Sequence, residues 1–76
     1  MKITNITTSW SSVTTTADEI WSSWNAMAII DTEPVEADRL GIPLLIGQTI
    51  PVPAGTTVYY RASEAGTPVI ARVAGL

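Results

Sequence analysis

Acidic side chains gather in one short stretch of this 76-residue chain, and their type and spacing could support chemistry. Neighbouring carboxyl groups can act as general acid and general base, and carboxylate oxygens can bind Ca²⁺. The spacing does not match an EF-hand loop, which needs a glycine at its sixth position and a terminal glutamate. We therefore interpret the stretch as a solvated loop. Its acidic residues are Asp31, Glu33, Glu36 and Asp38.

The rest of the chain lacks the residue types that most catalytic sites need. It contains neither histidine nor cysteine, which excludes the common nucleophile–base pairs and the usual zinc sites. Serine–lysine chemistry would depend on Lys2, next to the N-terminus. The five glycines are isolated and make no phosphate-binding loop. The sequence predicts a protein that is not an enzyme and holds no metal or cofactor.

Three tryptophans are many for so short a chain, and they allow three interpretations. Trp10, Trp21 and Trp24 could form a stacking platform for sugars. They could equally be core residues or anchors at a subunit interface, because tryptophan buries a large area with little loss of entropy. Trp21 and Trp24 differ in strand parity, so at most one of them points into a given core. The other is left for a second sheet, a neighbouring chain or a ligand.

Two arginines near the C-terminus are candidates for contacts with another chain. Arg61 and Arg72 are expected on neighbouring strands, where bidentate contacts with acidic residues of an adjacent subunit could fix the registry. The alternative is an exposed cross-strand pair that contributes little to stability. Tyr59 shares the strand face of Arg61. The candidate interface residues are Trp10, Trp21, Trp24, Tyr59, Arg61 and Arg72.

The elements that must position these side chains have the pattern of short β-strands. Threonine, valine and isoleucine are abundant, and apolar runs are separated by glycine, proline or acidic turns. A helix over Ala17–Ile30 is disfavoured by the serines and the asparagine within it. The spacing predicts an all-β fold, a small antiparallel β-sandwich or barrel of about six to seven short strands. Eight segments fit a strand pattern, and the first of them, Lys2–Thr7, overlaps a possible extended N-terminal arm. The other seven are Ser9–Thr14, Asp18–Trp24, Ala26–Asp31, Ile42–Ile46, Gln48–Val52, Thr57–Ala62 and Pro68–Ala74.

The last two candidate strands form the clearest local pattern. A turn of sequence Glu-Ala-Gly-Thr separates Thr57–Ala62 from Pro68–Ala74. Two strands joined by a short loop that contains glycine predict a β-hairpin. Its apolar face would carry Val58 and Val69, and the two arginines would lie on the opposite face.

Length and composition favour a partner chain. The chain is long enough for a single β domain, residues 1–76, in which residues 1–8 could form an extended N-terminal arm. Without disulfides or zinc, a domain of this size commonly gains stability by oligomerisation or by docking onto an assembly. Hydrophobic residues make up 46% of the chain and charged residues 14%, whereas soluble domains carry roughly 25% charge. We expect another chain to cover part of the apolar surface.

The charge pattern argues against two classes of partner. The net charge is −3, and the four cations, Lys2, Arg39, Arg61 and Arg72, are too scattered to bind a phosphate backbone. The N-terminal segment lacks the apolar core of a signal peptide. No run approaches the roughly 18 apolar residues of a membrane span. The sequence predicts binding to neither nucleic acid nor membrane.

Two patterns stand out in the second half of the chain: a G-x-x-I-x-V-x-A-G segment at Gly47–Gly55, and a V-Y-x-R-A strand within Thr57–Ala62. With these patterns, the order of strands and loops resembles that of small virion proteins of tailed bacteriophages. The match covers most of the chain and includes no catalytic motif. Its other parts are Asp18–Asn25, Met27–Ile30, Thr32–Asp38, Leu44–Ile46 and Val69–Val73.

The resemblance implies a compact β-sandwich or barrel on phage heads or tails, often trimeric, with no catalytic residues. The expected function is that of a capsid decoration or cement subunit, which stabilises the head by bridging capsomers at the virion surface. Its partners would be further copies of itself, as a trimer, and the major capsid protein. A tail, baseplate or fibre-associated module is the alternative within this class. From another class, a small carbohydrate-binding module for host-surface sugars stays open.

Overall fold

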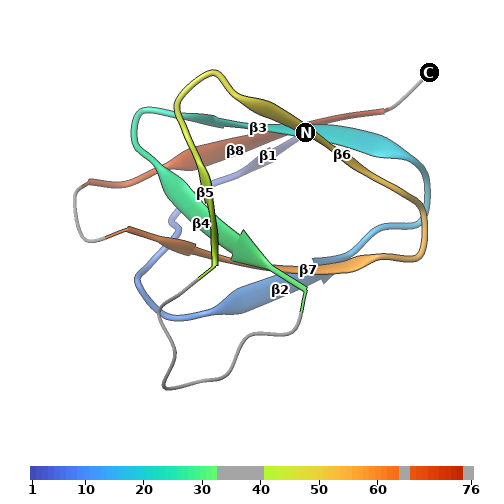
Figure 1. Ribbon diagram of the computed structural model, residues 1–76, viewed down its shortest axis with the longest axis horizontal. Helices are drawn as coiled ribbons and strands as arrows, with labels where there is room; N and C mark the ends of the chain where they lie inside the picture. The colour runs from blue at the N-terminus through green and yellow to red at the C-terminus, as the bar shows by residue number, and fades with distance from the viewer. Residues whose placement is uncertain (33–40, 64–65, 75–76) are drawn as a thin grey trace.

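The computed structural model describes residues 1–32, 41–63 and 66–74, which form a two-layer β-sandwich (Figure 1). Each layer is an antiparallel sheet of four strands, so the prediction of a small all-β sandwich is confirmed. The described residues form eight strands rather than six to seven. Sheet A contains, in spatial order, β1 (Lys2–Ile3), β8 (Val69–Ala74), β3 (Glu19–Trp24) and β6 (Thr49–Val52). Sheet B contains β2 (Ser11–Thr14), β7 (Thr57–Ala62), β4 (Ala28–Asp31) and β5 (Ile42–Leu44).

The chain changes layer at almost every connection. Among the described strands, β4 and β5 are the only sequence neighbours that share a sheet. Tight reversals are needed where the chain crosses, and residues with positive φ supply them. Asn25 (φ 70°) lies between β3 and β4, and Gly47 (φ 82°) lies between β5 and β6. These turns stack one sheet on the other instead of extending a single sheet.

The predicted C-terminal hairpin is wrong. Strand β7 pairs with β2 and β4 in sheet B, whereas β8 pairs with β1 and β3 in sheet A. The sequence pattern is misleading because the more apolar side of β8, with Val69 and Val73, faces outward, whereas Arg72 lies on the inward side with Ile70. The structure buries Ile70 completely and leaves Val73 on the other side 60% exposed.

The core lies between the two sheets and extends to the N-terminal segment. Trp21, Leu44 and Ile70 are fully buried. Buried hydroxyls are hydrogen-bonded, as the cost of burying them requires: Ser23 Oγ donates to the Ala26 carbonyl at 2.7 Å. The core cluster is Ile6, Trp21, Ala28, Ile30, Leu44, Val52, Val58, Tyr60, Ala62 and Ile70.

The described part of the chain contains no helix, and therefore none with the length and apolar character needed to cross a membrane. The helix considered over Ala17–Ile30 is replaced by β3 and β4.

Candidate interaction surfaces

The side of sheet A that faces away from sheet B is apolar. Along β3, Trp21 and Ser23 are completely buried, whereas Ile20 and Trp24 point to the opposite side. The strand register places outward residues of the neighbouring strands beside them. We call this surface the sheet A outer face. Its strand residues are Lys2, Ile20, Ser22, Trp24, Thr49, Pro51, Val69, Ala71 and Val73.

Large hydrophobic side chains remain exposed on this face. The exposed fractions are 43% for Ile20, 49% for Trp24 and 60% for Val73. Ile20 lies opposite Val73 on one side and Pro51 on the other, so an apolar row crosses three strands. Contiguous exposed apolar patches on a small protein mark sites of interaction with other macromolecules.

The sheet A outer face carries few polar groups that are free to bind a charged ligand. The indole Nε1 of Trp24 donates to Ser22 Oγ at 2.8 Å, which leaves the apolar ring as the available surface. Lys2, on the edge strand β1, is the one charged side chain among the described strand residues of the face. The face therefore offers apolar contacts and little charge.

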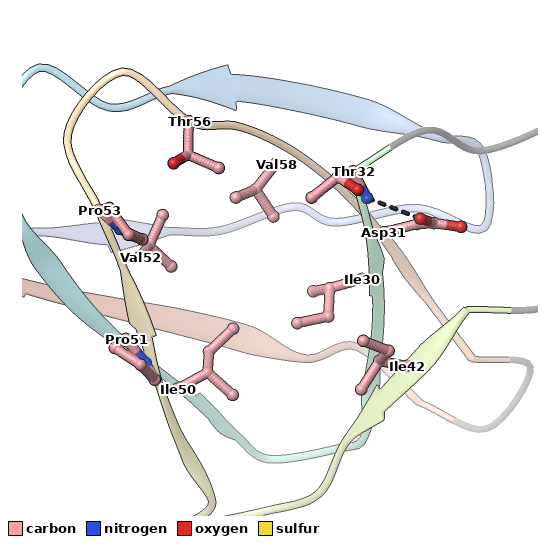
Figure 2. A pocket seen from close by; sticks show the side chains of 10 residues that line it. All are labelled: Ile30, Asp31, Thr32, Ile42, Ile50, Pro51, Val52, Pro53, Thr56 and Val58. Atoms are coloured by element: carbon pink, nitrogen blue, oxygen red, sulfur yellow. Dashed lines mark hydrogen bonds between the residues drawn. The ribbon is translucent and has the colours of Figure 1, made fainter.

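A second apolar feature is a groove of about 390 Å³ between β6 of sheet A and β4 and β5 of sheet B (Figure 2). Side chains from both sheets point into it, and at its rim the Thr32 amide donates to Asp31 Oδ1 at 2.7 Å. Its volume lies within the range of small-molecule pockets, and its walls are almost entirely apolar. The lining residues are Ile30, Asp31, Thr32, Ile42, Ile50, Pro51, Val52, Pro53, Thr56 and Val58.

Both edge strands beside the groove contain proline. Pro43 lies in β5 and Pro51 lies in β6. Proline in a paired strand is tolerated where its missing N–H faces away from the ladder, so neither edge offers a full row of donors to an added strand. An occupant of the groove would therefore be held by apolar side-chain contacts rather than by strand pairing.

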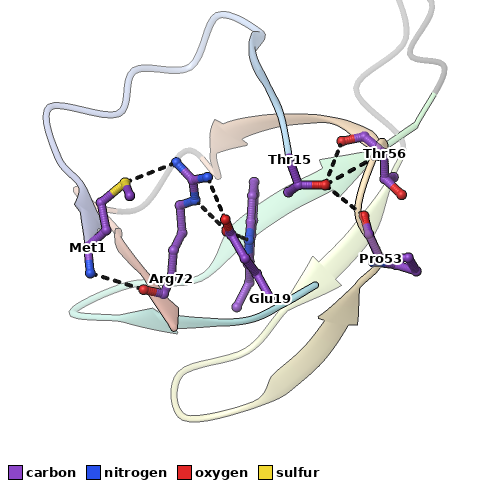
Figure 3. A network of polar contacts seen from close by, with 7 residues as sticks. Met1, Thr15, Glu19, Pro53, Thr56 and Arg72 are labelled. Atoms are coloured by element: carbon purple, nitrogen blue, oxygen red, sulfur yellow. Dashed lines mark hydrogen bonds and ion pairs between the residues drawn. The ribbon is translucent and has the colours of Figure 1, made fainter. Parts of the chain in front are cut away.

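An ion pair links the neighbouring strands β3 and β8 of sheet A (Figure 3). Arg72 Nε and Nη2 donate to the two carboxylate oxygens of Glu19 at 2.8 and 2.9 Å. Trp21 Nε1 donates to Glu19 Oε1 at 2.9 Å, and the Arg72 guanidinium lies 5.4 Å from the centre of the Trp21 ring. The pair is mostly buried, with side-chain exposures of 12% and 13%.

The Arg72 guanidinium and the Trp21 indole shift the pKa of Glu19. Hydrogen bonds from Arg72 lower the pKa of Glu19 below its ordinary value, against the opposing effect of desolvation, and the bond from Trp21 lowers it further. A carboxylate with a lowered pKa stays ionised near neutral pH and is a poor proton donor. The cluster therefore links β3 to β8 through an ionised carboxylate.

The three tryptophans occupy three different environments. Trp21 is completely buried, Trp24 is half-exposed on the opposite side of the same strand, and Trp10 precedes β2 of the other sheet. The Arg61 guanidinium lies 5.3 Å from the centre of the half-buried Trp10 ring. The expected parity difference between Trp21 and Trp24 is confirmed. The three indoles do not form one flat platform.

The two arginines lie in different sheets, so their predicted placement on neighbouring strands is wrong. Arg61 of β7 is 3% exposed, and its Nη1 donates to the Ala62 carbonyl at 2.9 Å. Tyr59 is half-buried on the same side of β7. Arg72 engages Glu19 within its own chain. Of the acidic loop, Asp31 ends β4, and Glu33, Glu36 and Asp38 lie outside the described residues.

Two residues, Thr15 and Glu19, make hydrogen bonds that the sequence pattern did not predict. Thr15 is 1% exposed, and its Oγ1 donates to the Pro53 carbonyl at 2.7 Å, which ties the end of β2 to the β6–β7 turn (Figure 3). Glu19 lies inside the candidate strand Asp18–Trp24, and the sequence pattern gave it no role. The position of Glu19 two residues before Trp21, on the same strand side, was the available signal.

Comparisons with known protein families, with characterised proteins and with solved structures give no match. Among the described residues, no three acidic, histidine or cysteine side chains are grouped so that they could hold a metal ion.

Proposed function

We propose that this protein is a structural subunit that works by packing the sheet A outer face against other protein chains. The observation that carries the proposal is the exposed apolar row of Ile20, Val73 and Pro51, with Trp24 beside it. Tryptophan and aliphatic side chains on a rigid sheet lose little conformational entropy on binding, so they are efficient anchors. The nearly uncharged face matches the depletion of charge in the centre of protein interfaces.

The setting that we propose is the surface of a tailed-phage virion, with the chain as a capsid decoration subunit that bridges capsomers. This part rests on the resemblance carried by Gly47–Gly55 and Thr57–Ala62. A capsid presents many identical docking sites, so a modest contact per chain becomes effective through multivalency. A tail or baseplate position is the alternative, and it would use the same apolar face.

Particle binding by matched variants tests the proposal. Virions of the phage that encodes the chain are stripped of it, incubated with purified protein, and sedimented. Ile20→Ser removes an anchor from the face, whereas Ile42→Ser removes an exposed isoleucine of β5 that lies at the groove instead; their exposed fractions are 43% and 63%. We expect Ile20→Ser to weaken particle binding about tenfold and Ile42→Ser to leave it unchanged. Equal binding of both variants and the wild type, or absence of the chain from purified virions, would contradict the proposal.

A further inference from the structure

Three of the four edge strands in the sandwich carry features that block strand addition. The edges are β1 and β6 of sheet A, and β2 and β5 of sheet B. Strand β1 has only two residues, one of them Lys2, and the strands β5 and β6 contain Pro43 and Pro51. Short length, lysine and proline are the usual protections of a sheet edge. Strand β2 has none of them: its sequence is Ser-Ser-Val-Thr.

The register identifies which backbone groups β2 leaves unpaired. The Thr15 amide donates to the Thr56 carbonyl at 3.0 Å, which continues the ladder between β2 and β7. Because hydrogen-bonding directions alternate along an antiparallel strand, Val13 faces β7 as Thr15 does, whereas Ser12 and Thr14 direct their N–H and C=O groups outward. Ser12 and Thr14 are both exposed. The β2 edge therefore presents two donors and two acceptors to the outside.

We propose that the β2 edge pairs with the β2 edge of a second copy of this chain. In an antiparallel arrangement about a two-fold axis, Ser12 of one copy lies opposite Thr14 of the other. Their outward groups then form four backbone hydrogen bonds. The two B sheets merge into one continuous sheet of eight strands. This contact is separate from the sheet A outer face and does not depend on the function proposed above.

The side chains at this edge favour a second copy as the occupant. A two-fold contact sets a surface against itself, so any charge in it meets a like charge. Strand β2 has no charged residue, and serine, threonine and valine are mutually compatible across a strand pair. Each copy carries a net charge of −3, so long-range repulsion opposes the contact and salt screens it. The contact area is small, so we expect weak association that strengthens with added salt.

Sedimentation velocity from micromolar to millimolar protein, combined with amide hydrogen exchange, tests the proposal. We expect a monomer–dimer equilibrium in which the Ser12 and Thr14 amides exchange more slowly as the concentration rises. The Val13 amide already faces β7 and serves as an internal control. A protein that stays monomeric at millimolar concentration in added salt would overturn the proposal. So would a trimer, or a dimer whose Ser12 and Thr14 exchange is independent of concentration.

Charge variants at Ser12 give a second measurement of self-association. Because Ser12 is exposed, these substitutions should leave the fold intact. Ser12→Lys and Ser12→Glu each place like charges across the two-fold axis, and each should weaken self-association about tenfold. An equimolar mixture of the two variants should form a heterodimer at least as readily as the wild type dimerises. Gln48→Lys and Gln48→Glu, in the exposed β5–β6 turn, are the matched controls and should leave association unchanged. Failure of the mixture to restore association would overturn the proposal.

Discussion

Ile20 and Val73 lie directly opposite each other on antiparallel strands β3 and β8, and both side chains point away from the core. An apolar cross-strand pair of this kind normally lies under a second layer. Sheet A thus has two apolar sides: sheet B covers one, and none of the described strands covers the other.

The opposite environments of two tryptophans predict opposite effects on stability. Trp21→Ala removes a fully buried ring and should lower the free energy of unfolding by about 3–5 kcal/mol. Trp24→Ala removes a half-exposed ring and should lower it by about 1 kcal/mol or less. Urea denaturation followed by far-UV circular dichroism measures both. Similar losses for the two variants would mean that Trp24 also belongs to the core of the isolated chain.

The ion pair between Glu19 and Arg72 should raise the free energy of unfolding. Glu19→Gln leaves the Arg72 guanidinium without its bidentate partner in a mostly buried position. We expect a loss of about 2 kcal/mol, between the values typical of exposed and fully buried pairs. Asp18→Asn is the matched control, because Asp18 is an exposed neighbour that accepts one hydrogen bond, from the Ala54 amide. An equal effect of both substitutions in thermal or urea unfolding would argue against this role for Glu19.

The same pair predicts a pH dependence of defined sign. Hydrogen bonds from Arg72 place the folded-state pKa of Glu19 below its ordinary value of 4.5. The contribution to stability is therefore fully present above that value and is lost as the pH falls through the folded-state pKa. The difference in unfolding free energy between wild type and Glu19→Gln should be constant from neutral pH to about pH 5 and then shrink on acidification. A difference that is unchanged or grows in acid would contradict this assignment.

The strand alternation in the sequence was sufficient to predict some features and not others. In β3, the three-residue spacing of Trp21 and Trp24 predicted that they lie on opposite sides of the strand, and the structure places them so. In β8 the more apolar side carries Val69 and Val73, and the other side carries Ile70 and Arg72. The local pattern therefore favoured the wrong inward side, because the structure buries Ile70 and pairs Arg72 with Glu19. The pattern also could not show that β8 pairs with β1 and β3 rather than with β7.

The arginines illustrate a second limit of the sequence. Charge alone favoured an exposed or intersubunit position for Arg61 and Arg72. The structure instead sets each guanidinium against an indole ring, at 5.3 Å from Trp10 and 5.4 Å from Trp21. These partners are far apart in sequence, so they become visible only once the sheet register is known. The exposure of Ile20 and Val73 could not be predicted either, because isoleucine and valine are usually buried.

Hydroxyl-radical footprinting of the chain, free in solution and on the virions where we propose that it assembles, tests the central claim most directly. The measured quantity is the oxidation rate of Trp24, with the exposed Ile46 in the β5–β6 turn as the reference. If the sheet A outer face packs against other chains, Trp24 should be strongly protected on the particle while the Ile46 rate stays near its value in solution. Equal Trp24 oxidation in both states would contradict the account.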